Sequence, residues 1–244
     1  MRRFFAPQES FGTDSVTLDE NETRHLRDVL RLKVGDAANV FDGVGNEFEC
    51  RVQNIEKRSS ILSIAANVAP MAPESDLDLT ICASILKGDK TDFAVQKLVE
   101  LGVKRFVPML SARCDVKPKD AAKRVDRWRK IALEAAKQCG RALLMSVDEV
   151  KNFNELLRTE SDSGGSEKEI VVFSERDGEA FSFPGNPRAI TAFLGPEGGW
   201  DDAELEHARE SRADIITLHG RIMKADTAAV AISAILQHRF GDLN

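Results

Sequence analysis

The stretch Phe193-Leu-Gly-Pro-Glu-Gly-Gly-Trp200 decides the fold of this chain, together with Leu218-His-Gly-Arg-Ile-Met-Lys-Ala-Asp-Thr-Ala228 further along. Each runs from an apolar segment through a glycine-rich or polar turn into a helix-like pattern. An α/β protein builds a ligand site in this way at the carboxyl ends of its strands. Gly195, Gly198 and Gly199 have no Cβ, so the backbone can take positive φ and a ligand can approach it closely. We therefore predict a pocket lined mainly by backbone. Its main role would be to bind a ligand, and catalysis would be secondary.

The side chains of these two turns leave several roles open. The first turn, Gly195–Gly199, matches neither a dinucleotide-binding nor a P-loop pattern, so an enzyme that binds nucleotide phosphates is a poor alternative. Glu197 would be a buried carboxylate that is paired, braces its loop or contacts a ligand. Asp226 or Thr227 either caps the following helix or lines the site. His219 is the one histidine in a candidate site. Both turns are expected at neighbouring strand ends.

From residue 77 onward, strand-like and helix-like segments alternate, which is typical of an α/β fold with a mostly parallel sheet. Gly102 suits the end of the first helix, and Asp201 or Asp202 suits the N-cap of the helix after the glycine turn. The polar run Thr159–Lys168 has the composition of a flexible loop. Strands are predicted over 77–86, 105–110, 170–174, 190–194 and 215–218, and helices over 89–101, 121–138, 153–157, 201–211 and 227–240.

Residues 1–70 have another pattern, of short β segments. Residues 34–52 alternate apolar and polar side chains around a glycine-bearing turn, which predicts a hairpin, and 61–65 predicts a further strand. One short helix is expected over 25–32, with Thr23 as its N-cap. Small β-barrels assembled from such segments often bind RNA.

A proline-bearing segment separates the two patterns and marks the expected domain boundary. The predicted division is a β-barrel over 1–70, a linker over 71–76 and an α/β domain over 77–244.

Length and composition limit the kinds of protein that this chain can be. A chain of 244 residues, with 42% hydrophobic and 30% charged residues, suits a globular protein with a substantial core. No apolar run reaches the roughly 18 residues that a membrane span needs. Polar residues interrupt the apolar start before it can serve as a signal peptide. The four cysteines lie far apart without ligand-like spacing. We expect a cytoplasmic protein with reduced cysteines, no membrane segment and no structural metal.

The net charge of −6 does not suggest a nucleic-acid partner, but the positive charges are clustered. Acidic residues are sparse in both clusters, so solvated surfaces and RNA-binding surfaces are open alternatives of similar weight. The first cluster comprises Arg2, Arg3, Arg24, Arg27, Arg31 and Lys33, and the second comprises Arg113, Lys117, Lys119, Lys123, Arg124, Arg127, Arg129 and Lys130.

An ordered set of short motifs covers nearly the whole chain. It consists of Arg3-Phe-Phe5, His25–Arg31, Gly35-Asp36, Phe41–Gly43, Lys87-Gly-Asp-Lys90, Gln96-Lys97, Glu100–Val103, Pro108, Ser111–Arg113, Arg127-Trp128, Ala135-Ala136, Gln138, Arg141, Leu194–Gly199, Glu204, Leu218, Arg221-Ile222 and Thr227-Ala228. In this order the motifs resemble the RsmE family, the uracil-N3 methyltransferases of bacterial 16S ribosomal RNA in the SPOUT superfamily.

This resemblance implies an N-terminal PUA-like β-barrel and a C-terminal SPOUT domain with a trefoil knot, an exception to unthreaded topology. It further implies a homodimer that acts on 16S rRNA of the small ribosomal subunit and binds S-adenosylmethionine in the knot, largely through backbone. The residues implied to hold this cofactor are Leu194, Gly195, Glu197, Gly198, Leu218, Arg221, Ile222, Met223, Thr227 and Ala228.

Methyl transfer to uracil N3 requires stabilisation of the uracil anion. Gly140 suits the position after the long helix, so Arg141 would project toward the edge of the sheet. Arg141 and Lys224 are the candidates for stabilising the uracil oxygens or guiding RNA phosphate, and Glu197 for positioning the cofactor or accepting the proton. Four arginines of the barrel are expected to contact RNA phosphates, namely Arg3, Arg24, Arg27 and Arg31.

The chain departs from the usual family pattern at several positions. In the second turn His219 replaces glycine, Met223 leucine, Lys224 arginine and Asp226 glutamate, and Met145 stands where proline is frequent. Lysine keeps the charge of arginine but loses its planar fork, and aspartate is shorter than glutamate by one methylene. These changes keep a second function open, that of a ribosome-binding or assembly protein that retains the SPOUT fold with weak or altered methyltransferase activity.

Overall fold

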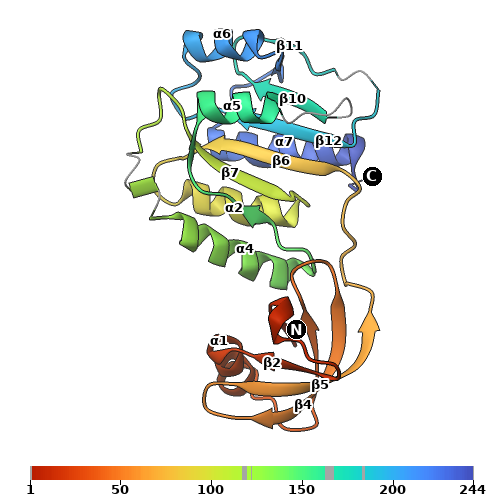
Figure 1. Cartoon of the computed structure of the whole chain (residues 1–244). Helices are drawn as coiled ribbons and strands as arrows, with labels where there is room; N and C mark the ends of the chain where they lie inside the picture. Colours follow the sequence, from red (N-terminus) through yellow and green to blue (C-terminus); the bar gives the residue numbers. More distant parts are fainter. Residues whose placement is uncertain (1, 117–119, 122, 163–167, 183–184, 244) are drawn as a thin grey trace. The chain divides into compact units, whose positions relative to one another are not determined.

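The structure is a computed structural model that describes residues 2–116, 120–121, 123–162, 168–182 and 185–243 (Figure 1). The chain divides into two compact units. The N-terminal unit consists of residues 1–74 and 136–144, and the C-terminal unit of residues 75–135 and 145–244. The structure therefore groups residues 136–144 with the first unit, whereas the sequence pattern placed them within 77–244.

The N-terminal unit contains a five-stranded sheet in the order β1-β3-β4-β5-β2. Its strands are β1 (Arg3–Phe5), β2 (Ser15–Leu18), β3 (Ala37–Phe41), β4 (Glu47–Ile55) and β5 (Ser60–Val68), and the 3-10 turn η1 spans Gln8–Ser10. The predicted hairpin is confirmed as β3 and β4, and the further strand as part of β5. Alternate side chains of these strands, such as Phe4, Val40 and Leu62, are buried in one apolar cluster.

The short helix of this unit begins earlier than predicted. Helix α1 (Glu20–Arg24) continues into the π-helical turn η2 (His25–Val29). Asp19 is the N-cap, because its carboxylate accepts a hydrogen bond from the Glu22 amide at 2.8 Å. The prediction of Thr23 as the cap was wrong: its hydroxyl donates to the Leu18 carbonyl instead. Val29, the last residue of η2, is 66% exposed.

The C-terminal unit contains an eight-stranded sheet in the order β11-β13-β10-β12-β6-β7-β8, with β9 also paired to β7. All of its strand pairs are parallel, so the predicted α/β architecture is confirmed. The strands are β6 (Asp78–Ser84), β7 (Arg105–Leu110), β8 (Ser146–Val147), β9 (Lys151–Asn152), β10 (Lys168–Phe173), β11 (Glu179–Ala180), β12 (Ala189–Leu194) and β13 (Asp214–Thr217). The sequence pattern missed the three two-residue strands, which are too short to show periodicity.

Helices cover both faces of this sheet (Figure 1). The helices are α2 (Lys90–Glu100), α4 (Val125–Cys139), α5 (Phe153–Asp162), α6 (Asp202–Glu210) and α7 (Ala225–Phe240). Helices α5 and α6 pack together on one face, over a core that includes Phe153, Phe193 and Trp200. Helices α2 and α7 pack together on the other face. Within the described ranges, no helix is both long enough and apolar enough to cross a membrane.

The polar run predicted as a flexible loop is structured at both ends. Helix α5 extends to Asp162 and β10 begins at Lys168, while residues 163–167 lie outside the described residues. Glu160 explains this extension, because its carboxylate pairs with Arg105 and with Lys168, at 2.8 and 2.7 Å.

In the C-terminal unit, the predicted N-terminal cap of α6 and the predicted glycines after α2 and α4 are confirmed, whereas the predicted cap of α7 is not. Asp201, one of the two predicted candidates, caps α6 and forms a capping box with Glu204. Gly102 and Gly140 follow the ends of α2 and α4 with φ of 72° and 90°. Helix α7 begins before Asp226 and Thr227, so neither is its N-cap. Lys224 occupies that position without a side-chain bond.

The strand order corrects one expectation about the site. The glycine turn follows β12 and the second turn follows β13, but β10 lies between these two strands. Phe173, the last residue of β10, is in register with Leu194 on one side and with Ile216 on the other. Three consecutive strand ends, rather than two, therefore meet at the same edge of the sheet.

Candidate active site at three strand ends

A pocket of about 690 Å³ opens at this edge of the C-terminal unit. Its walls are the turn after β12, the turn after β13, the residues that follow β10, and parts of α2 and α7. The lining residues are Lys90, Phe173, Ser174, Glu175, Leu194, Gly195, Pro196, Glu197, Gly198, Gly199, Thr217, Leu218, His219, Gly220, Arg221, Ile222, Met223, Lys224, Ala225, Ala228 and Ile232. A cavity at the carboxyl ends of parallel strands is the expected ligand site of an α/β fold.

The glycine turn is fixed by a buried tryptophan. Trp200 is fully buried, and its indole Nε1 donates to the carbonyl of Phe173 at 2.8 Å, which ties the turn to the end of β10. The Gly199 amide donates to the Pro196 carbonyl at 3.0 Å and closes the turn. A Cβ at Gly195 would lie 3.1 Å from the Trp200 ring. The turn is therefore rigid, and its glycines leave room for neighbouring groups.

Only one of the three glycines in this turn has positive φ. Gly199 has φ of 70°, which a residue with a side chain rarely adopts. A Cβ at Gly199 would also lie 2.5 Å from Oε1 of Glu175. Gly199 is thus required both by its backbone conformation and by the carboxylate beside it.

The part of the pocket formed by the residues after β10 was not predicted from the sequence. Ser174 and Glu175 come directly after the end of β10 and line the pocket between the two predicted turns. Oε1 of Glu175 lies 3.8 Å from Nε of Arg176, a long ion pair that leaves the carboxylate open toward the pocket. The available signal was the position of these polar residues at the end of a predicted strand.

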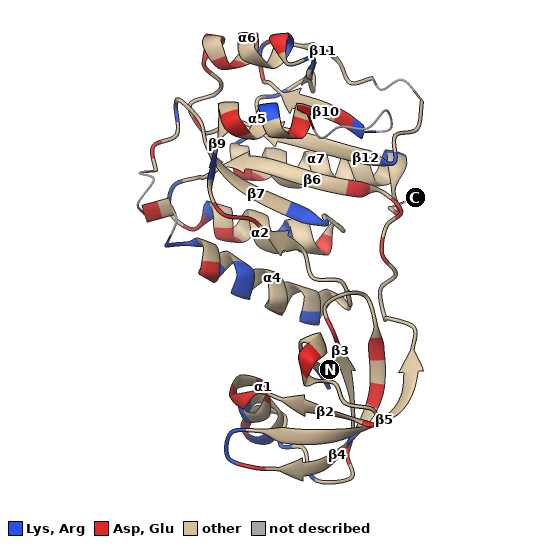
Figure 2. Cartoon of the chain, viewed as in Figure 1, with Lys and Arg blue, Asp and Glu red and all other residues tan. Residues whose placement is uncertain are grey.

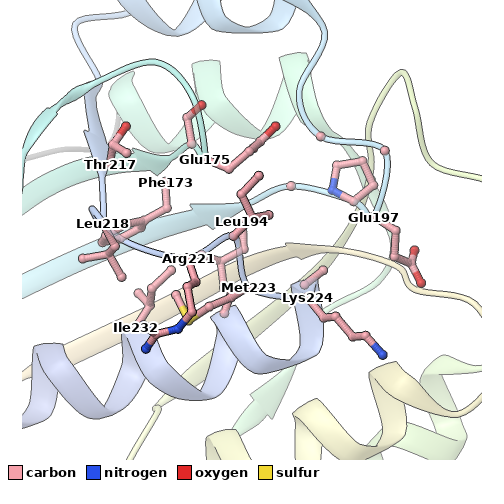
Figure 3. A pocket seen from close by; sticks show the side chains of 18 of the residues that line it. Phe173, Glu175, Leu194, Glu197, Thr217, Leu218, Arg221, Met223, Lys224 and Ile232 are labelled. Atoms are coloured by element: carbon pink, nitrogen blue, oxygen red, sulfur yellow. The ribbon is translucent and has the colours of Figure 1, made fainter.

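The pocket has an apolar end and a charged end. Figure 3 shows Phe173, Leu218 and Ile232 together at one end, and Glu197 and Lys224 at the other. The expectation that Glu197 is buried was wrong, because its side chain is 29% exposed. It is nevertheless paired: Nζ of Lys90 donates to Oε1 of Glu197 at 2.8 Å. This hydrogen bond, with the charge of Glu197, holds the pKa of the Lys90 ammonium above its ordinary value.

The structure brings together nearly all of the residues predicted to hold a cofactor. Nine of the ten predicted positions line the pocket, and Lys224 lines it as well. Thr227 is the exception: it is exposed and lies outside the lining. His219, the histidine of the candidate site, is an exposed lining residue.

Arg141 is not among the residues of this pocket. It belongs to the N-terminal unit, where its side chain is 4% exposed and forms an ion pair with Glu74 at 2.7 Å. Its predicted contact with the uracil oxygens does not follow from this placement, and the cations in the pocket lining are instead Lys90, Arg221 and Lys224.

The four arginines predicted to contact RNA divide into two groups. Arg3 is buried, and its guanidinium pairs with Glu47 and donates to the carbonyls of Ala136, Gly140 and Arg141. The prediction that Arg3 binds phosphate is therefore corrected, since it has no surface to offer. The remaining three lie on or directly after α1 and η2, where Arg24 and Arg31 are exposed and Arg27 is partly exposed.

Three of the six described cations of the second basic cluster are paired with neighbouring acids. Figure 2 shows both signs of charge along α4. Arg113 pairs with Asp201, Arg127 with Asp92, and Arg129 with both Asp126 and Glu149. Lys117 and Lys119 lie outside the described residues. A solvated surface is the better interpretation of the described part of this cluster.

The cysteines and acids show no metal-binding arrangement in the ranges that the structure covers. No group of three or more His, Cys, Asp or Glu side chains there could hold a metal ion. The four cysteines are free thiols. Burial raises the pKa of the Cys50 thiol to about 12 and raises that of Cys82 further, so both side chains are inert apolar groups in the cores.

Comparison with known proteins identifies the family. The model of an RNA methyltransferase domain matches residues 73–237, and that of an RNA methyltransferase PUA domain matches residues 18–65. The ribosomal RNA small subunit methyltransferase E (RsmE) of Bacillus subtilis is 31% identical over 249 residues, covering 96% of each chain. The chain belongs to the RsmE family of RNA methyltransferases. The RsmE protein of Mesomycoplasma hyopneumoniae is also 31% identical, over 94% of this chain and 96% of that one.

Solved structures agree with this assignment to the RsmE family. The RsmE protein of Neisseria gonorrhoeae bound to S-adenosyl methionine is 34% identical, with a TM-score of 0.89 and full coverage of both chains. A methyltransferase of Legionella pneumophila in complex with the same cofactor is 26% identical, with a TM-score of 0.87 over 99% of each chain. The predicted fold class, a SPOUT α/β domain with an N-terminal PUA-like domain, is confirmed.

Proposed function

We propose that this RsmE-family protein transfers the methyl group of S-adenosylmethionine to N3 of a uridine in 16S rRNA of the small ribosomal subunit. The observation that carries the proposal is the pocket at the ends of β10, β12 and β13, in a chain of which 96% matches the RsmE protein of Bacillus subtilis. The cofactor-bound structure from Neisseria gonorrhoeae supports the same cofactor for this chain.

The residues of the pocket fit S-adenosylmethionine. The apolar end, with Phe173, Leu218 and Ile232, suits the adenine ring, and the glycine turn offers close backbone approach. Glu175 offers an acceptor for hydroxyl or ammonium groups, and Arg221 offers a donor for a carboxylate. When bound, the cofactor supplies an already activated methyl group on its sulfonium, so the protein has mainly to position and to stabilise charge.

The charged end of the pocket suits the methyl acceptor. Uracil N3 carries a weakly acidic proton, and the ring becomes anionic when that proton leaves. Lys224 lines this end of the pocket and has no carboxylate partner among the described residues, so it is available to stabilise the uracil oxygens. Glu197 is the carboxylate that accepts the N3 proton or orients the cofactor.

The N-terminal unit supplies the RNA-binding surface. Arg24 and Arg31 present positive charge near one another in sequence, on and after α1 and η2, whereas Arg27 between them is paired with Asp28 at 2.7 Å. Contacts from arginines to phosphates position an RNA without reading its sequence. The predicted barrel therefore anchors the ribosomal RNA, and the pocket of the other unit modifies one base.

The protein acts as a homodimer in the cytoplasm, where ribosomal RNA is modified. Exposed apolar side chains on α2 and α7, the Phe93 and Ile235 side chains, support self-association through these two helices. Light scattering across a dilution series tests the dimer, and a monomer mass at every concentration contradicts it.

Mass mapping of 16S rRNA tests the activity. Small-subunit RNA from a strain without this gene should lack one methyl group on one uridine, and the purified protein with S-adenosylmethionine should restore it. Calorimetry with the cofactor runs in parallel. An absent cofactor-binding signal with intact ribosome binding would favour the alternative, a ribosome-binding or assembly protein of the same fold. A restored methyl group at another base or another ring position would contradict the assignment to uracil N3.

A further inference from the structure

Lys90 is a cation of the pocket that comes from neither of the two glycine-bearing turns. It is the first residue of α2 and ends the segment Lys87-Gly-Asp-Lys90. Gly88 has φ of 65°, which lets the chain turn sharply from the end of β6 into this helix. The pocket lining includes Lys90 but no other residue of α2.

The Lys90 ammonium is hydrogen-bonded to the carboxylate of the glycine turn. It donates to Glu197 at 2.8 Å. The negative charge of Asp226, in the first turn of α7, also raises the pKa of Lys90. Oδ1 of Asp226 is buried and has no hydrogen-bond partner among the described residues. The two stretches that define the site are thus linked electrostatically through one lysine.

This ion pair contributes little to stability, because both side chains are partly exposed, Lys90 by 40% and Glu197 by 29%. Its consequence is geometric instead. Glu197 lies between glycines in a turn that fixes the backbone but not the long glutamate side chain. A hydrogen bond from Lys90 selects the rotamers that keep the carboxylate on the α2 side of the pocket.

The three cations of the lining therefore divide into two groups. Arg221 and Lys224 have no carboxylate partner among the described residues, whereas Lys90 is committed to Glu197. A free cation is available to an anionic ligand or to a developing negative charge. A cation that is already paired, as Lys90 is with Glu197, acts on the ligand through the carboxylate that it holds.

We propose that Lys90 is a positioning residue for methyl transfer, which holds the Glu197 carboxylate in the orientation that the reaction requires. This role rests on the proposed function. The role concerns Glu197 as the acceptor of the N3 proton rather than as a cofactor ligand, so loss of Lys90 lowers kcat and leaves the affinity for S-adenosylmethionine nearly unchanged. It is also distinct from a simple need for charge near the acceptor, because it operates only through Glu197.

The test compares four variants with the wild-type protein: Lys90→Met, Lys90→Arg, Glu197→Gln and the double variant Lys90→Met/Glu197→Gln. Methylation of small-subunit RNA gives kcat and KM, and calorimetry gives the dissociation constant of S-adenosylmethionine. Lys151→Met is the matched control, since Lys151 belongs to the same unit, forms a long ion pair with Asp148 at 3.8 Å and lies outside the pocket lining.

Lys90→Met should lower kcat by roughly 10- to 100-fold, with cofactor affinity within about threefold of wild type. Lys90→Arg should recover most of the rate, because it retains a donor and a charge. In the Glu197→Gln background, Lys90→Met should have little further effect, since a positioning residue has nothing left to position.

Two outcomes would overturn the role of Lys90 in an active enzyme. One is a Lys90→Met variant with the full kcat, and the other is an undiminished effect of Lys90→Met in the Glu197→Gln background. A wild-type protein that transfers no methyl group to the RNA would instead contradict the proposed function, and the role of Lys90 with it. The rate of the wild-type protein separates these two failures.

Discussion

Arg141 and Glu74 form a bidentate ion pair within the N-terminal unit, with Nε 3.0 Å from Oε1 and Nη2 2.7 Å from Oε2. The guanidinium is nearly fully buried. Breaking a buried, bidentate arginine–carboxylate pair costs free energy, because an unpaired charge would remain inside the protein. This geometry assigns Arg141 to the integrity of its own unit.

Replacement of Arg141 by methionine should therefore destabilise the protein rather than disable its chemistry. We expect a loss of about 2–4 kcal/mol in the free energy of unfolding, measured by urea denaturation, since Glu74 loses its partner. Glu74→Gln should give a loss of the same sign. The methylation rate per folded molecule should stay within about threefold of wild type. If the methylation rate fell by about a hundredfold while the free energy of unfolding stayed unchanged, Arg141 would instead have a role in the reaction.

The exposed arginines of the N-terminal unit should control RNA affinity. Arg24→Gln and Arg31→Gln should each weaken binding of small-subunit RNA and reduce the slope of log affinity against log salt by about one. Filter binding at several salt concentrations measures both quantities. Arg212→Gln is the control for Arg31→Gln, since both residues have positive φ, 59° and 53°, and Arg212 is exposed in the other unit. An equal loss of affinity in the control would count against an RNA surface on α1 and η2.

Gly199→Ala should impair cofactor binding. The new methyl group would meet the Glu175 carboxylate, and the backbone strain alone costs about 1 kcal/mol. We expect at least a tenfold weaker dissociation constant for S-adenosylmethionine by calorimetry. Gly185→Ala serves as control, because Gly185 has φ of 79° but open space around its Cβ position. If both variants bind the cofactor as the wild type does, Glu175 does not border the bound molecule.

Glu160 should make the C-terminal unit sensitive to acid. Burial alone would raise the pKa of this carboxyl, but hydrogen bonds from Lys168 and Arg105 outweigh it and hold the pKa below its ordinary value. A lowered pKa in the folded state contributes stability above the unfolded pKa of roughly 4.3, and this stability is lost as the pH falls through the folded value.

The Glu160→Gln variant should accordingly lose about 1–3 kcal/mol at pH 7 and progressively less below about pH 4. Urea midpoints at neutral and acidic pH give the difference. Glu206→Gln, which breaks only an exposed pair with Arg209, should shift neither midpoint measurably. A penalty for Glu160→Gln that is constant with pH would contradict the assignment.

Local sequence signals predicted most of the elements correctly. The hairpin of β3 and β4 is encoded by alternation around a glycine-bearing turn, and the capping box of α6 by Asp201 and Glu204. Both depend on residues close together in the chain. The start of α1 was misplaced because Asp19 and Thr23 are both good caps, and only the packing of Thr23 against the preceding strand decides between them.

The order of strands in a sheet is not a local property, and this limited the prediction of the site. Nothing in the sequence placed β10 between β12 and β13, so Ser174 and Glu175 were missed. Arg3 was assigned to RNA phosphates and Arg141 to the uracil oxygens, from their charge and their places in the motifs. Their partners, Glu47 and Glu74, are too distant in sequence for any spacing rule to pair them.

Residues 136–144 belong to the N-terminal unit although they follow part of the C-terminal unit in the chain. Helix α4 begins among residues grouped with the C-terminal unit and ends among residues grouped with the N-terminal one. Three carbonyls of its last turn and the following residues accept hydrogen bonds from Arg3. A fragment cut after Glu74 would lose these acceptors and leave that guanidinium partly unsatisfied. The PUA-like part is therefore not a portable module, and a chimera that exchanges it between relatives has to carry both segments.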